Sequence, residues 1–356
     1  MKKITTIDIV LCIILTLVLC FSLNSCTVPD WLSVADAPDS FDISNEKIVD
    51  ADIGNNTAFY LTSSGSLYSP GGEHDMGCYT LYADDSIGLV ATDVKDFGKL
   101  HNGGYYVTKA NELYIWNYNQ LNDIGYTQSK KFQQVLSNVS WASICIHNSK
   151  EAFMTYIDMK NNLYICGKFN KEIIPSSSPK LLDSSVVCAQ ATTKNIIWFD
   201  ESGNYNIYGD TKDFEYFDKN VLIENNIKKV NRFEISNDSL SNGNTGYILM
   251  LSDDKLWYYG NLKRIGLSAE NKIDIVMLSE DIIDFSGDYR TIMGVNNQGE
   301  GKVWGYFLSN SNDEQQAPPY EKYNGKTMIH NVKGVTVGGQ NAAVFITDDY
   351  KTVAFS

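Results

Sequence analysis

The chain is built around a strand–turn–strand unit that recurs along its length. The clearest copy runs from Gly103 to Gly125, where Tyr105–Thr108 has the pattern of a strand, Lys109–Glu112 that of a polar turn, and Leu113–Trp116 that of a second strand. The other copies begin their second strand at Leu67, Leu163, Tyr205, Leu256, Val303 and Thr352. Successive second strands are therefore 42 to 51 residues apart. A strand-rich period of this length, without a convincing helix, is typical of propeller blades.

Seven copies predict an all-β chain, a seven-bladed β-propeller that spans residues 48–356. A single unit cannot bury both of its faces, whereas radial stacking covers each blade with its neighbours, and closing the ring removes the terminal edges. The seventh unit ends at Ser356, directly after its second strand, and so lacks an outer strand. We therefore expect Ser40–Ile43 to add a strand to the last blade and close the ring.

The N-terminus has the pattern of an export signal. Lys2 and Lys3 precede a mostly apolar run, Ile9–Leu23, which is short for a membrane span of about 20 residues. Leu23–Cys26 resembles the bacterial lipoprotein signal, in which the cysteine is lipidated and becomes the new N-terminus. This predicts a signal peptide at residues 1–25, lipidation of Cys26, and a tether with the closing strand at residues 26–47. The alternative is an uncleaved anchor, and both place the chain outside the cytoplasm at a membrane.

The charge balance excludes one class of partner. The formal net charge is −14, and removing residues 1–25 takes away two lysines and one aspartate, which makes the mature chain more negative still. A strongly acidic protein is repelled by phosphate backbones. We therefore expect no nucleic-acid partner.

The repeat resembles that of the regulator-of-chromosome-condensation (RCC) family. Ile48–Leu61 follows the first half of the family's repeat, with Gly54 in place and Thr57 where the family has histidine. Leu113–Gly125 follows the second half, with Asn117 and Asn122 where the family has glycines. Asparagine tolerates positive φ best among non-glycine residues, so these exchanges are physically reasonable. The resemblance covers residues 48–356.

The resemblance implies a seven-bladed propeller that binds a protein. One family member exchanges nucleotide on a small GTPase and binds nucleosomes, a secreted bacterial member inhibits β-lactamases, and many others are binding scaffolds. The acidity of this chain, its expected export and its lack of a basic tail argue against the exchange activity. An enzyme inhibitor remains an alternative.

No linear motif predicts catalysis. The four histidines lie in different units without ligand spacing, so we expect no metal and no cofactor. A polysaccharide hydrolase or lyase remains an alternative, because carboxylates from different blades can converge in the central channel. Cys145 and Cys188 permit a disulfide, although free buried thiols are the favoured interpretation.

The aromatic residues fall into two groups. Those at one shared repeat position predict core between blades: Trp116, Tyr208, Tyr259, Tyr306 and Phe355. Others lie in the variable connections and are candidate partner contacts, with ordinary loop packing as the alternative: Tyr118, Tyr82, Tyr216, Phe217, Tyr320 and Tyr323. The sequence thus predicts a monomeric, non-enzymatic binding module of the cell envelope, with a protein or a glycan as partner.

Overall fold

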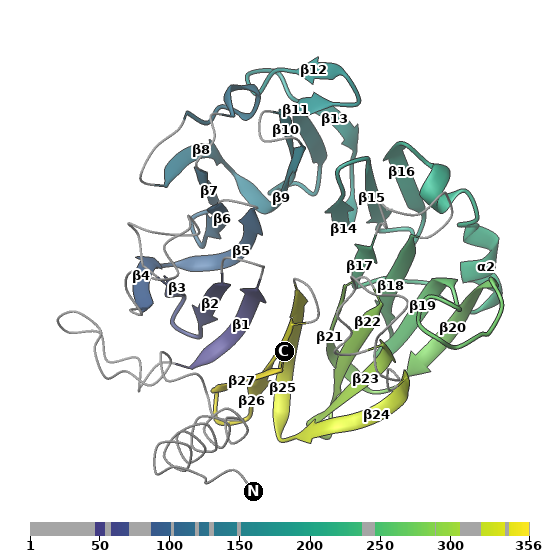
Figure 1. Cartoon of the computed structure of the whole chain (residues 1–356). Helices are drawn as coiled ribbons and strands as arrows, with labels where there is room; N and C mark the ends of the chain where they lie inside the picture. Colours follow the sequence, from purple (N-terminus) through teal and green to yellow (C-terminus); the bar gives the residue numbers. More distant parts are fainter. Residues whose placement is uncertain are drawn as a thin grey trace, which may run out of the picture.

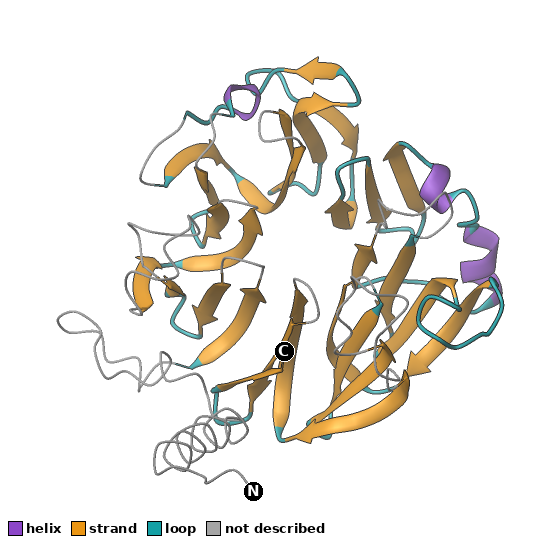
Figure 2. Ribbon diagram, viewed as in Figure 1, coloured by secondary structure: helices purple, strands orange, loops and turns teal. Residues whose placement is uncertain are grey.

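The protein is a seven-bladed β-propeller, as the repeat predicts. The computed structural model describes residues 47–53, 58–70, 87–100, 103–117, 121–127, 132–147, 151–236, 246–288, 290–306, 322–338 and 342–355. These residues form seven antiparallel sheets. The sheets are arranged around one central axis, with the first strand of each nearest to it (Figure 1; Figure 2).

The blades differ mainly in their outer strands. Four of them have four strands each: blade 1, with β1 (Ile48–Ile53), β2 (Ala58–Thr62), β3 (Leu67–Pro70) and β4 (Ile87–Ala91); blade 2, with β5 (Val94–Leu100), β6 (Gly103–Thr108), β7 (Glu112–Asn117) and β8 (Gln133–Ser137); blade 5, with β17 (Arg232–Ser236), β18 (Tyr247–Ser252), β19 (Lys255–Asn261) and β20 (Ile273–Ser279); and blade 6, with β21 (Ile282–Asp288), β22 (Thr291–Asn296), β23 (Glu300–Tyr306) and β24 (Lys322–His330).

The other three blades depart from this plan. Blade 3 has five strands: β9 (Val139–His147), β10 (Glu151–Asp158), β11 (Leu163–Phe169), β12 (Glu172–Ile174) and β13 (Lys180–Asp183). Blade 4 has β14 (Val186–Ala191), β15 (Asn195–Asp200) and β16 (Tyr205–Gly209), and blade 7 has β25 (Val332–Gly338), β26 (Ala342–Thr347) and β27 (Thr352–Phe355). Short helices, which the sequence did not predict, occur in connections: η2 (Asn122–Ile124), η3 (Lys212–Phe214) and α2 (Lys219–Glu224).

The predicted strand positions agree with the structure. β3, β11, β16 and β27 begin at the residues expected for the second strand of the repeat, and β7, β19 and β23 begin within three residues of them. One local prediction was wrong. Asn122 begins the 3₁₀ helix η2 instead of taking positive φ, and Gly125 takes the left-handed conformation (φ 79°) that ends this helix.

The hydrophobic core lies between neighbouring blades. Trp116 and Tyr259 are buried, and Tyr208 and Tyr306 are half-buried, in agreement with the shared aromatic position of the repeat. Across the junction of blades 4 and 5, the rings of Phe199 and Phe233 meet edge to face with centroids 5.0 Å apart. Each blade therefore depends on its neighbours for burial of its aromatic side chains.

A repeated backbone joint connects five pairs of successive blades. At the last of them, Asn331 (φ 62°) precedes β25, and its carbonyl accepts the Asp348 N–H at 2.7 Å. The next residue, Val332, donates its N–H to the Gly299 carbonyl, in a turn of blade 6, at 3.1 Å. The same pair of bonds occurs around four other positive-φ residues: Asp93, Asn138, Ser185 and Asp281. Aspartate and asparagine suit this position because their short polar side chains lower the cost of positive φ.

Blades 1 and 7 contact each other directly. Ile48, Ala51 and Tyr60 of blade 1 form a buried cluster with Ile346 of blade 7. The Lys47 ammonium lies 4.6 Å from the centre of the Tyr350 ring. The expected closing strand, Ser40–Ile43, lies outside the described residues and stays a prediction.

The cysteines that the structure describes carry free thiols. Cys166 is buried and Cys145 and Cys188 are half-buried, without a disulfide between them. Burial raises the pKa of the Cys145 and Cys188 thiols to about 12. This confirms the favoured interpretation of free thiols. Within the described part of the chain, no helix is long and apolar enough to cross a membrane.

The blade joint yields a prediction. Asn331→Val should lower the free energy of unfolding by about 1–3 kcal/mol, because a β-branched residue is strained at positive φ. Asn331→Gly is the matched control and should change it by less than about 0.5 kcal/mol, because glycine adopts this conformation freely. Urea unfolding measures both. Equal stability of the two variants would contradict the role of the joint.

Candidate functional site: the central channel

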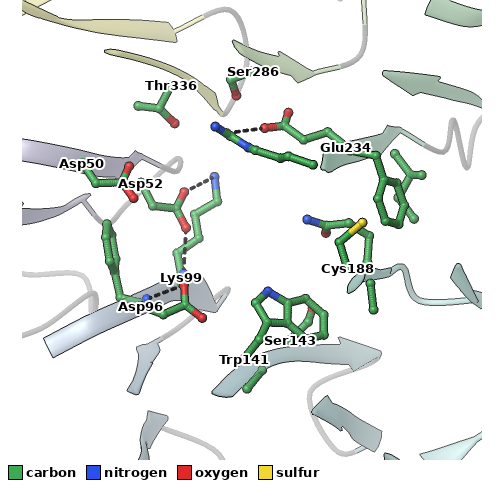
Figure 3. A pocket seen from close by; sticks show the side chains of 18 of the residues that line it. Asp50, Asp52, Asp96, Lys99, Trp141, Ser143, Cys188, Glu234, Ser286 and Thr336 are labelled. Carbon is green, nitrogen blue, oxygen red and sulfur yellow. Dashed lines mark hydrogen bonds and ion pairs between the residues drawn. The ribbon is translucent and has the colours of Figure 1, made fainter. Parts of the chain in front are cut away.

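The innermost strands of all seven blades line a central cavity of about 890 Å³. Two positions recur in every inner strand, and the residues at these positions line the cavity except for Asp284 and Gly334. The first position holds Asp50, Asp96, Trp141, Cys188, Arg232, Asp284 and Gly334. The second holds Asp52, Gly98, Ser143, Gln190, Glu234, Ser286 and Thr336. Figure 3 shows 18 of the residues that line the channel and labels ten of them.

Several of these side chains hydrogen-bond to the backbone of the next blade. The Lys99 N–H donates to Asp52 Oδ2 at 2.9 Å, and the Gly287 N–H donates to Glu234 Oε2 at 2.8 Å. The Val335 N–H likewise donates to Asp284 Oδ2 at 2.7 Å. An inner strand is the edge of its sheet, so some of its amides have no partner within their own blade. These carboxylates supply the missing acceptors.

Arg232 neutralises part of this charge. Its guanidinium contacts Asp284 Oδ1, donates to Glu234 Oε1 at 3.0 Å and to the Phe285 carbonyl at 2.9 Å, and lies 4.8 Å from the centre of the Phe285 ring. Burial opposes the charge of Arg232, but Asp284 and Glu234 more than offset this and raise its pKa. On the other side of the channel, Lys99 Nζ lies 3.7 Å from Asp52 Oδ1.

Asp50 and Asp96 form no direct ion pair among the described residues, although the charge of Arg232 lowers the pKa of Asp50 and that of Lys95 lowers the pKa of Asp96 from farther away. Asp50 Oδ1 accepts the N–H of Ala51 at 2.8 Å, and Asp96 Oδ1 accepts the N–H of Phe97 at 3.0 Å. Asp96 Oδ2 is shielded from solvent and has no hydrogen-bond partner in the described part of the chain. The Ala142 N–H of the next blade lowers the Asp96 pKa somewhat but lies outside hydrogen-bonding geometry.

The two carboxyls are correspondingly hard to ionise. Burial, followed by the negative charge of Asp284, raises the pKa of Asp50 to about 6. Burial, followed by the charge of Asp50, raises the pKa of Asp96 to about 7. Asp50 touches the water of the channel, but the surrounding protein restricts the hydration of its charge. The channel therefore holds two coupled carboxyls that titrate near neutral pH.

The predicted partner-binding residues lie away from this channel or outside the described residues. Tyr82, Tyr118 and Tyr320 lie outside the described residues. Tyr216 donates its hydroxyl proton to the Gly246 carbonyl at 2.6 Å, and Tyr323 is half-buried on β24 with the Lys326 ammonium 4.9 Å from its ring centre. Phe217 is 4% exposed and packs against Tyr205 and Tyr259, so contact with a partner would require it to leave the core.

The charged residues of the channel were not predicted from the sequence. Asp50, Asp96 and Asp284 each stand two residues after the apolar residue that begins the inner strand, and Arg232 stands two residues after Val230, so a signal was present in the repeat alignment. What the alignment does not reveal is which of them are paired across blades. Within the described residues, no three His, Cys, Asp or Glu side chains are placed to hold a metal ion.

Comparison with solved structures identifies proteins of similar fold. No family model and no curated protein matches the chain. Among solved structures, Prp20p from Saccharomyces cerevisiae has a TM-score of 0.58 at 12% identity, covering 87% of this chain and 83% of that one. Yeast RCC1 (Prp20) bound to Kap60 has a TM-score of 0.55 at 13% identity, covering 82% and 78%. The fold is a seven-bladed propeller of the RCC1 type. At these identities, the likeness concerns the fold alone.

The raised pKa of Asp96 predicts a dependence of stability on pH. Because the folded state holds the Asp96 proton up to about pH 7 while the unfolded state releases it near pH 4, this group lowers stability as pH rises between those values. Asp96→Asn should therefore raise the free energy of unfolding at pH 8 by about 1–2 kcal/mol, allowing for hydration from the channel, and change it little at pH 4.

Urea unfolding at pH 4, 6 and 8 checks this prediction. The matched control is Asp253→Asn, which removes one exposed carboxylate from a turn and keeps a residue that accepts positive φ. A stability difference between Asp96→Asn and the wild type that does not change with pH would contradict the account.

Proposed function

We propose that the protein is a non-enzymatic binding module of the cell envelope that recognises a protein partner through one end of the propeller. This end, termed the joint face, is formed by the positive-φ joint residues and the turns that they contact. The observation that carries the proposal is a pair of exposed apolar side chains on rigid strands of this face. Val49 of blade 1 is 41% exposed and Ile283 of blade 6 is 50% exposed.

The exposure of these side chains follows from a repeated backbone irregularity. In six inner strands the register shifts just after the first residue, which inserts one extra residue into the strand: Val49, Lys95, Ser140, Val187, Ile283 and Lys333. A β-bulge of this kind leaves the extra residue outside the regular ladder and re-aims its side chain. The bulge positions thus vary between blades without loss of the fold, as a recognition surface requires.

The part of the surface that lies between the side chains of Val49 and Ile283 is also suited to contact with a partner. Blade 7 lies between blades 6 and 1 and contributes Tyr350, a half-buried aromatic residue beside Lys47 and Lys333. Exposed apolar and aromatic side chains with a polar rim, held by a rigid scaffold, are typical of protein-binding surfaces.

The structural neighbours support a protein partner. The Prp20p structure is described together with its binding to Gsp1p and histones, and the second structure is a complex of yeast RCC1 with Kap60. Propellers of this fold therefore bind proteins. An inhibitor of an exported enzyme would use the same kind of surface, and a glycan ligand would bind instead through polar and aromatic residues.

Capture of the partner tests the joint face. Purified protein should retain a component of envelope extract, and Val49→Asp with Ile283→Asp should reduce that capture at least about tenfold, because charge is costly in an apolar contact. The matched control, Ile173→Asp with Leu181→Asp, alters two exposed apolar residues of the outer strands of blade 3 and should leave capture unchanged.

The nature of the captured component separates the alternatives. Capture that is lost after protease treatment of the extract supports a protein partner. Capture that survives protease but is lost after glycan digestion would contradict it, as would equal loss in both double variants.

The location is the second part of the proposal. The pattern Leu23–Cys26 supports export and anchoring through a lipid on Cys26, with residues 26–47 as the tether. Cys26→Ser should move the protein from the membrane fraction to the soluble fraction, because a lipid chain provides the anchor. A Cys26→Ser protein that stays in the membrane fraction would contradict lipidation.

A polysaccharide hydrolase or lyase is the second candidate, favoured by the Asp50–Asp96 pair. Glycoside cleavage uses two carboxyls, one of which has a raised pKa. Against this, one oxygen of Asp96 is shielded from solvent and both side chains bond to their own strand. Release of reducing ends from envelope polysaccharide, abolished by Asp50→Asn, would establish the enzyme.

A further inference from the structure

One turn of the joint face carries a residue that its backbone conformation disfavours. In six blades, the turn between the second and third strands is closed by a hydrogen bond from its fourth residue to the carbonyl of its first, and the fourth residue takes positive φ. Five of these residues are glycine or asparagine, which tolerate this conformation best: Gly65, Asn111, Asn161, Gly203 and Gly299. The sixth is Tyr350 of blade 7, with φ 66°.

The packing of Tyr350 does not account for this choice. A bulky side chain at positive φ is strained, and such residues persist where a function or the surrounding structure requires them. The Tyr350 side chain is half-buried and belongs to none of the hydrophobic clusters that the described residues form. Within the described part of the chain, its ring is contacted by two ammonium groups. Lys47 Nζ lies 4.6 Å from the ring centre, and Lys333 Nζ lies against the same ring.

The two lysines make this turn locally positive. Lys47 is exposed and forms no ion pair among the described residues. Lys333 Nζ is shielded from solvent and has no hydrogen-bond partner among them. Burial lowers the pKa of Lys333, and the charge of Lys47 adds to this, while Asp348 and Asp349 offset the change only in part. Asp349 itself pairs with Lys351 at 3.1 Å. Positive charge therefore gathers at Lys47 and Lys333, in a chain whose formal net charge is −14.

Tyr350 also lies between the two exposed apolar residues of the joint face. In Figure 1, β25 of blade 7 lies between β21, whose second residue is Ile283, and β1, whose second residue is Val49. Tyrosine is enriched among the residues that dominate the affinity of protein interfaces, because it offers a large contact area at a low cost in conformational entropy. A strained tyrosine at the centre of a proposed contact surface thus indicates a role in that contact.

We propose that Tyr350 is the anchor residue of the joint face, and that Lys47 beside it pairs with a carboxylate of the partner. This inference rests on the proposed function and names the chemistry of the partner: a protein segment that presents an aspartate or glutamate next to an apolar side chain. The apolar side chain packs against the Tyr350 ring, and the carboxylate reaches the exposed ammonium of Lys47. Lys333, shielded behind the ring, contributes through its charge.

A purely structural role for the ring is the alternative. Lys47 occupies the joint position of blade 1, because its carbonyl accepts the Ser63 N–H at 2.8 Å in the way that the Asn331 carbonyl accepts the Asp348 N–H. On that view, the Tyr350 ring serves only to hold Lys47 and so to close blade 7 on blade 1. The two roles predict different effects of Tyr350→Asn on stability. A closing role predicts a loss, whereas a binding role predicts none, since asparagine suits positive φ.

Urea unfolding and capture from envelope extract, both measured on the whole mature protein, separate these roles. Tyr350→Asn should keep or raise the urea midpoint, because strain is relieved, and should reduce capture at least about tenfold, because the anchor is lost. The matched control is Tyr208→Asn in blade 4, which removes a half-buried tyrosine that also has a lysine ammonium beside its ring. It should lower the midpoint, because Tyr208 stacks on Phe169 without backbone strain, and leave capture unchanged.

A zero-length cross-link tests the chemistry of the partner. Carbodiimide joins a carboxylate to an amine where the two are in contact. Mass spectrometry should find Lys47 joined to an aspartate or glutamate of an envelope protein, and Tyr350→Asn should remove this product. Lys47→Arg lacks the reactive amine and should remove it as well, which assigns the product to this position. The Asp349–Lys351 pair should cross-link in every variant and serves as the internal control.

Each outcome has a single meaning. A lower urea midpoint for Tyr350→Asn overturns the inference, since the ring then serves the fold. Undiminished capture by Tyr350→Asn also overturns it, and the proposed function still holds if Val49→Asp with Ile283→Asp loses capture. Full capture by that double variant contradicts the proposed function instead. Absence of any cross-link from Lys47 to another protein, or a cross-link to a second copy of this chain, overturns the carboxylate contact.

Discussion

The free edge of each inner strand is the constraint on which the structure depends. Seven sheets meet around one axis, and each first strand has a pairing partner on one side only. Its remaining amides cannot stay unsatisfied without a cost of about 1–3 kcal/mol each. Two repeated devices meet this need. A joint with a residue at positive φ connects the start of five of the inner strands to the preceding blade, and side chains such as Asp284 accept amides of the next inner strand.

The use of carboxylates to bridge the blades determines the charge of the channel. Carboxylates that bridge blades bring negative charge to the axis, and Arg232 and Lys99 balance only part of it. Asp50 and Asp96 occupy equivalent positions in blades 1 and 2, yet neither forms a direct ion pair among the described residues. The channel is therefore polar, acidic and titratable near neutral pH because of how the ring is assembled.

The repeat revealed the blades because their signal is local. Leu67, Leu163 and Tyr205 each begin a strand of alternating apolar residues after a polar turn, and the structure confirms these positions. The channel was expected as a place where carboxylates from different blades can converge, but its residues were not predicted. Contacts such as the one between Asp284 and Val335 join residues 51 positions apart, which no local pattern encodes. Phe217 lies in a connection that looked variable, but its ring fills the core beside Tyr259, where blade 4 has no described fourth strand.

Amide hydrogen exchange at the inner edges tests the account most directly. The N–H groups of Lys99, Gly287 and Val335 face away from their own sheets and donate to carboxylates of the preceding blade. We expect them to exchange as slowly as amides that pair within the same blades, such as those between β25 and β26. Exchange of these three amides at the rate of an unprotected peptide, while the paired amides stay protected, would contradict the stabilisation of the ring by carboxylates between blades.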